Sequence, residues 1–220
     1  MTITGAGGVT ITGNVIAGTV VNIGGRVLVN GMEVPAGTVA GGRVEITAHV
    51  PEGSTVAAFT RSAPLACSGE FAEVDFTSVS GDLTVGGVGA LRVKTTSGDV
   101  SAAVVDGAAV VRSVSGDVYL GRADDVYALT TSGDVTVNDF AGRAGLATVS
   151  GDVRVRAAEG GHIRVRSVSG DVTVTATVKA LGLMVDATSR TGRVTTPTDT
   201  PPGAAFASRA RRPRRTNGGA

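Results

Sequence analysis

The tripeptide Ser-Gly-Asp recurs six times in the chain, and this repeat constrains the fold more than any other feature of the sequence. Successive copies lie 17, 18, 17, 18 and 19 residues apart, beginning at Ser80, Ser97, Ser115, Ser132, Ser150 and Ser169. A unit this short cannot enclose a core by itself, so it must bury its apolar side chains against neighbouring units. A period of this length indicates a solenoid with one repeat per coil.

The apolar residues keep fixed positions relative to each serine. When each serine is counted as position 0, positions −6, −4, +3 and +5 are apolar in all six copies, and the positions between them are mixed. Position +3 is Leu83, Val100, Val118, Val135, Val153 and Val172. Alternation with a period of two predicts β-strands with one buried face. The sequence thus predicts an all-β fold, a single-stranded parallel β-helix (β-solenoid) of 17–19-residue coils.

The repeat divides the chain into three parts. Degenerate copies of the turn at Ser62 and Thr191 extend the predicted β-solenoid over residues 51–196. Residues 1–50 predict a strand-rich segment that is continuous with the solenoid. Residues 197–220 are rich in Pro, Gly and Ala and lack apolar periodicity. This last part therefore predicts a disordered, Arg-rich tail.

Shorter stretches carry more local predictions. Residues 7–18 and 22–31 have the pattern of strand pieces within the N-terminal segment. Residues 178–187 belong to the last and longest interval, 22 residues between Ser169 and Thr191. Because a solenoid end exposes unpaired strand edges, residues 178–187 predict either a cap for that edge or an oligomer contact.

The repeated turn is predicted to be structural. Its glycine is expected in the left-handed conformation, and its aspartate is expected to accept backbone N–H groups. The Ser or Thr at positions 0 and −2 are expected to point inward with stacked hydroxyls. The alternative is a calcium site in the aspartate column, for which the weak candidates are Asp99, Asp117, Asp134 and Asp152. Calcium takes about six to eight oxygens, and one carboxylate per coil supplies few, so no metal and no cofactor is predicted.

No catalytic residue is predicted. The two histidines, His49 and His162, lie far apart in the repeat and have no evident carboxylate partner. Cys67 falls in an inward column, which predicts a buried and inert thiol. A carbohydrate-active enzyme would need an acidic groove, and short coils leave little room for one. The sequence therefore predicts a protein that is not an enzyme.

Two groups of arginines are the candidate partner-binding residues. Arg154, Arg156, Arg164 and Arg166 crowd one coil, near Arg143, and alternation points all four outward as a local basic belt. The tail carries five more, which predict non-specific contact with nucleic acid or an anionic membrane: Arg209, Arg211, Arg212, Arg214 and Arg215. The sequence shows neither a secretory signal nor an apolar run that could span a bilayer, which predicts a cytoplasmic protein.

The rhythm SVSGDV…TTSGDV, preceded by HVPEGSTVAAFTRSA, carries a resemblance to a known family. Residues 44–196 resemble the bacterial β-strand-repeat family of unknown function that is labelled an adhesin. The resemblance implies a β-solenoid and no catalytic residues.

The function that follows is a structural or interaction scaffold, adhesin-like, which presents a strand face to a protein or polysaccharide. Two alternatives stay open. One is a solenoid that self-assembles into oligomers or filaments through its ends, and the other is a carbohydrate-binding or carbohydrate-active β-helix.

Overall fold

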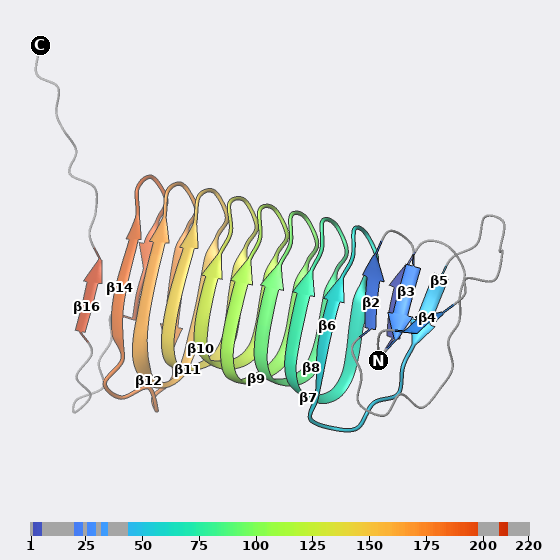
Figure 1. Cartoon of the computed structure of the whole chain (residues 1–220). Coiled ribbons are helices and arrows are strands. Elements are labelled where there is room, and N and C mark those ends of the chain that lie inside the picture. The colour runs from blue at the N-terminus through green and yellow to red at the C-terminus, as the bar shows by residue number, and fades with distance from the viewer. Residues whose placement is uncertain are drawn as a thin grey trace, which may run out of the picture.

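The chain forms a rod of stacked β-coils (Figure 1). The structure is a computed structural model that describes residues 2–5, 20–23, 26–29, 32–34, 44–197 and 207–210. Within these residues there are strands and turns and no helix. The predicted parallel β-solenoid is therefore confirmed.

Six long strands make up most of the rod, and shorter strands flank them at both ends. The long strands are β7 (Leu65–Thr77), β8 (Leu83–Lys94), β9 (Val100–Arg112), β10 (Val118–Leu129), β11 (Val135–Thr148) and β12 (Val153–Ser167). On the N-terminal side are β1 (Thr2–Gly5), β2 (Val20–Ile23), β3 (Arg26–Val29), β4 (Met32–Val34), β5 (Val44–Thr47) and β6 (Ser54–Phe59). On the C-terminal side are β13 (Val172–Ala176), β14 (Met184–Ser189), β15 (Val194–Thr195) and β16 (Ala207–Ala210).

Consecutive long strands pair in parallel, and the predicted columns stack. Val118 is in register with Val100 on one side and with Val135 on the other. All three side chains are buried in one continuous apolar core that follows the rod from coil to coil. Each added coil therefore buries its apolar residues on those of the coil before it, as a solenoid requires.

Each long strand bends near its middle, where the pairing register shifts. The two halves of one strand consequently lie on two faces of the rod. In β12, Val153–Ala157 pairs with β13, whereas His162–Ser167 pairs with β14. We call the surface formed by the second halves, with β6 and β14, the front face, which is turned toward the viewer in Figure 1. The surface formed by the first halves, with β13 and β15, is the rear face.

The glycine of the Ser-Gly-Asp turn is required by close packing and not by a left-handed backbone. Among the described glycines only Gly53, Gly69, Gly142 and Gly182 have positive φ angles, so the left-handed conformation predicted for the turn glycines is wrong. A Cβ at Gly116 would instead lie 2.0 Å from the carbonyl oxygen of Gly98, one coil earlier. The turns are stacked so closely that no side chain fits between them.

The hydroxyls of the turn have two different roles. Position −2 is buried, as predicted, and its hydroxyl accepts the N–H of the turn glycine three residues later, for example Gly133 N to Thr130 Oγ1 at 3.1 Å. The serine at position 0 is exposed, so its predicted inward orientation is wrong. Its hydroxyl donates to a backbone carbonyl of the preceding coil, as Ser115 does to Thr96 at 3.1 Å.

The turn aspartates connect neighbouring coils. The Oδ1 atom of Asp117 accepts the backbone N–H of Asp134 at 2.8 Å, and the same contact recurs from Asp82 to Asp171. At the last turn, the N–H of Arg193 takes the place of the aspartate N–H, at 2.7 Å from Asp171 Oδ1. The aspartates thus accept backbone N–H groups as predicted, but from the next coil.

The N-terminal strands cover the edge of the first long strand. β1 runs antiparallel to the start of β7, with Thr2 and Ile3 opposite Ala66 and Leu65, and β6 pairs with the second half of β7. Strands β2, β3 and β4 form a small antiparallel sheet, and β2 lies beside β6 (Figure 1). The strand predicted at 7–18 lies outside the described residues, whereas 22–31 overlaps β2 and β3.

At the C-terminal end the stacking continues past the predicted boundary. β14 pairs with β12 on one edge and with β16 on the other, so residues 178–187 are not the last layer of the rod. Ala207–Ala210 forms β16, which means that this part of the predicted disordered tail has a regular conformation. Apart from residue 197 and β16, the tail lies outside the described residues.

Candidate partner-binding face

The four arginines predicted to form one basic belt lie on two different faces. Arg154 and Arg156 are in the first half of β12, in register with Thr173 and Thr175 of β13 on the rear face. Arg164 and Arg166 are in the second half, in register with β14 on the front face. All four side chains are exposed, as predicted. They surround the coil and do not form one patch.

The two rear-face arginines are already neutralised by carboxylates. Arg154 lies between two turn aspartates, 3.2 Å from Asp134 Oδ2 and 2.9 Å from Asp152 Oδ2. Arg156 is 3.5 Å from Asp139. Such exposed pairs add little stability, but they leave these cations less available to a partner.

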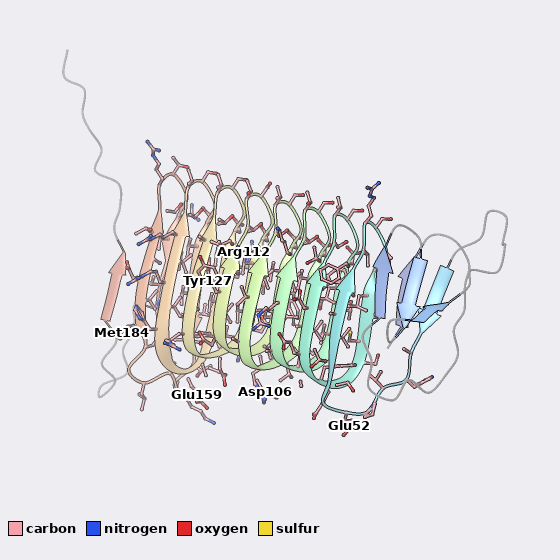
Figure 2. The ribbon with its side chains drawn as sticks, in the orientation of Figure 1. Glu52, Asp106, Arg112, Tyr127, Glu159 and Met184 are labelled. Carbon is pink, nitrogen blue, oxygen red and sulfur yellow. The ribbon has the colours of Figure 1, made fainter. Side chains whose placement is uncertain are left out.

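Arginine pairing also occurs at the bend and on part of the front face. At the bend, Arg122 donates to Asp106, labelled in Figure 2, at 2.6 Å, and this hydrogen bond raises the pKa of the guanidinium above its ordinary value. The front-face pairs are Arg92 with Glu73, Arg143 with Asp125 at 3.1 Å, and Arg164 with Asp186 at 3.6 Å.

Three front-face cations have no carboxylate within ion-pairing distance among the described residues: Lys94, Arg112 and Arg166. All three occupy position −3 of their coils and are exposed. The register joins them through Leu129 and Ala147 into one column. Lys94 and Arg112 are adjacent, and Arg166 lies three strand spacings, about 14 Å, beyond Arg112. We call these three residues the cation row.

The cation row is unpaired because its column contains no acid. Its other described members in β7 to β14 are Thr77, Leu129, Ala147 and Thr188. The neighbouring outward columns do contain acids, which explains why their arginines are paired. Sequence reasoning named Arg166 but missed Lys94 and Arg112. The signal was present when the repeat copies were aligned on their serines, since position −3 is an outward column that contains cations and no carboxylates.

An aromatic side chain lies next to the gap in the cation row. Tyr127 is 45% exposed and is in register with Gly145. Its ring carbon Cδ2 lies 3.4 Å from the position that a Cβ of Gly145 would take, so the ring rests on bare backbone. Figure 2 shows Tyr127 and Arg112 on the same face of the rod. The aligned repeats also contained a signal for this residue, because an outward tyrosine in one coil is followed by a glycine at the same position of the next coil.

The aspartates considered for calcium are engaged by the protein itself. The Oδ1 atoms of Asp99, Asp117, Asp134 and Asp152 each accept a backbone N–H of the next coil. The Oδ2 atoms of two of them, Asp134 and Asp152, hold Arg154. In the part of the chain that the structure describes, no group of three or more His, Cys, Asp or Glu could hold a metal ion.

The histidines lie apart from one another. His49 is exposed and precedes β6, whereas His162 is half-buried and in register with Arg143 and Met184 on the front face.

Of the tail arginines only Arg209 falls in a described strand, in register with Asp186, while Arg211, Arg212, Arg214 and Arg215 lie outside the described residues. No helix that could span a membrane is found in the described part of the chain.

Cys67 is buried in β7, as predicted, and burial raises the pKa of its thiol to about 11. Because the thiolate is the reactive form, a raised pKa keeps the thiol protonated and inert near neutral pH. We expect a chromogenic disulfide reagent at pH 7.5 to label the native protein at least about a hundredfold more slowly than the protein unfolded in guanidinium. Equal rates in the two states would contradict this burial.

Comparison of the chain with curated proteins and with solved structures finds no match to either. A family model does match, and it covers residues 7–216, which includes every coil of the solenoid, the cation row and Tyr127. The chain belongs to the Toastrack DUF4097 family.

Proposed function

We propose that this protein is a non-enzymatic, adhesin-like interaction scaffold whose front face binds an acidic partner. The observation that carries the proposal is the cation row. Lys94, Arg112 and Arg166 lack a carboxylate partner among the described residues, whereas Arg154 and Arg156 on the rear face are both paired. Unpaired cations on a rigid surface attract an opposite charge without first breaking an ion pair.

The solenoid supports this function by fixing the spacing of the charges. The strands that carry the cation row are hydrogen-bonded on both edges, and their inward residues are buried in the common core. Little backbone entropy is therefore lost when a partner binds, so more of the interaction energy appears as affinity. A rod of this kind is suited to an extended partner.

The structure of the N-terminal end argues against end-to-end self-assembly as the function. Both halves of β7 have a strand partner there, β1 on the first half and β6 on the second. A second copy that stacked on this end would have to displace them. The antiparallel direction of β1 also interrupts the parallel pattern that open-ended stacking would continue.

The proposal is tested by removing the cation row and measuring retention on a carboxymethyl cation-exchange matrix. The front-face variant is Lys94→Gln, Arg112→Gln and Arg166→Gln. We expect it to elute at a lower salt concentration than the wild-type chain at pH 7. The tail arginines are unchanged in this variant, so their contribution to retention is the same in both proteins.

A rear-face variant provides the matched control. Thr84→Glu, Thr136→Glu and Thr173→Glu lower the net charge by the same amount at three outward positions of the rear face. We expect this protein to elute close to the wild type. If both variants elute equally early, net charge alone governs retention and the front face is not a binding surface.

A further inference from the structure

The partner of the front face can be specified more closely, on the basis of the proposed function. We propose that the front face binds a linear acidic polysaccharide, with carboxylates of the chain on the cation row and one sugar ring on Tyr127. The inference combines three observations: the line of unpaired cations, the gap within it, and the aromatic ring beside that gap.

The cation row runs along the axis of the rod. Neighbouring coils are about 4.8 Å apart, so the charges follow one line across the strands, from Lys94 through Arg112 to Arg166 about 19 Å away. A small anion would contact only one or two of these residues. A linear polymer with a charge on successive units can contact all three, and guanidinium groups pair well with carboxylates.

The gap in the cation row is lined by apolar residues and by a glycine without a side chain. Leu129 and Ala147 replace cations there, and Gly145 lies in the adjacent outward column. The Tyr127 ring rests on Gly145, and the π face of an aromatic ring is electron-rich. Such a face attracts C–H groups, which pyranose rings present on their apolar sides. The centre of the front face therefore favours a sugar unit, while the two ends of the cation row favour its charged neighbours.

The same face is less suited to other polyanions. Single-stranded nucleic acids are bound by several aromatic rings in succession, but the two exposed aromatic residues of the described front face, Phe59 of β6 and Tyr127 of β10, lie four coils apart. Four carboxylates also lie on the front face, and three of them, Glu73, Asp125 and Asp186, are paired with its arginines, whereas Asp75 has no ion pair among the described residues. The free positive charge of the front face is thus limited to the cation row, a single line that suits one linear polymer and offers little to the broad surface of an anionic bilayer.

The test is equilibrium binding of the full chain to polygalacturonate, with dextran of similar length as the neutral control. We expect binding to polygalacturonate that weakens with added salt, and no binding to dextran. Tyr127→Ala should weaken the affinity about tenfold, as expected for loss of one stacked ring. Replacing the cation row with glutamine should weaken the affinity more than Tyr127→Ala does, and only the salt-sensitive contact of the tail arginines should remain.

A second tyrosine provides the matched control for Tyr127. Tyr119 is 44% exposed on the rear face, where its hydroxyl accepts from Asn138 at 2.7 Å. Tyr119→Ala should leave the affinity for polygalacturonate unchanged. Circular dichroism and the Tm of each variant show that a loss of binding is not a loss of fold.

Other probes separate this inference from the proposed function. If polyglutamate binds as tightly as polygalacturonate, and Tyr127→Ala has no effect, the partner is not a polysaccharide. The proposal that the front face binds an acidic partner is then retained. Single-stranded DNA or phosphatidylglycerol vesicles could instead bind more tightly than polygalacturonate, in a way that depends on the cation row. That result would likewise overturn only the assignment of a polysaccharide as the partner. If removal of the cation row changes binding to none of these probes, both the inference and the proposed function fail.

Discussion

Gly116→Ala is expected to abolish cooperative folding of the central coils or to lower the Tm by about 10 °C or more. The added methyl carbon would lie 2.0 Å from the carbonyl oxygen of Gly98 and 2.6 Å from its carbonyl carbon. Both are backbone atoms of the coil beneath, held in the stack by the hydrogen bonds of the turn. Ordinary overpacking costs about 1–3 kcal/mol, and a contact with immobile backbone is expected at or above the upper limit.

Gly145→Ala is the matched control for this prediction. Its Cβ would meet only the Tyr127 ring, at 3.4 Å, which is an ordinary van der Waals contact with a side chain on the surface. Thermal unfolding followed by circular dichroism compares the two variants. A Gly116→Ala protein with the wild-type Tm would mean that the turns are not packed as closely as the structure shows.

Phe140→Ala is expected to destabilise the rod by about 3–5 kcal/mol, because a fully buried aromatic side chain leaves a large cavity. Phe140 is 0% exposed and lies at the bend of β11. Its partners in register are Ala123 on one side and Ala157 on the other, so the ring fills space that both neighbours leave empty. These neighbours are too small to close the cavity without movement of the backbone.

The control for Phe140 is another phenylalanine on the surface. Phe59 ends β6 and is 48% exposed, so Phe59→Ala is expected to change the free energy of unfolding by less than about 1 kcal/mol. Urea unfolding of the two variants gives the comparison. Similar small changes in both proteins would show that the core collapses around the bend when Phe140 is removed.

The position of Phe140 shows how far the repeat could predict the core. The columns at −6, −4, +3 and +5 were predictable because the serine lies a fixed number of residues away from each. Phe140 belongs to a further inward apolar column, at the opposite bend, with Phe71, Val88, Val105, Ala123 and Ala157. Four of its members, from Val88 to Phe140, lie eight residues after the serine. Strict alternation from +3 and +5 predicts +7 as the next inward position, and the bend moves the inward side chain to +8, which a period of two cannot predict.

The turn was predictable in its residues but not in its geometry. Gly and Asp in a short turn usually indicate a left-handed backbone and a local Asx contact. These expectations failed because the sequence does not show how closely the coils are stacked. In the structure this close stacking explains both residues, since Gly116 lies against the Gly98 carbonyl and Asp117 accepts the N–H of Asp134.

The candidate site was only partly predictable for a similar reason. Alternation showed correctly that Arg154 and Arg164 point outward, but the bend of β12 that puts them on opposite faces falls at a variable position. The difference between a paired and an unpaired cation depends on the residues one coil away. Arg164 has Asp186 as that neighbour, whereas Arg166 has Thr188.

The contact between successive turn aspartates has a direction along the chain. The carboxylate always belongs to the earlier coil and the N–H to the later one, from Asp82 to Arg193. A coil that has already folded therefore offers a ready acceptor to the segment that follows it. Because the N-terminal part of a chain generally folds first during synthesis, we expect each finished layer to act as a template for the layer that next leaves the ribosome.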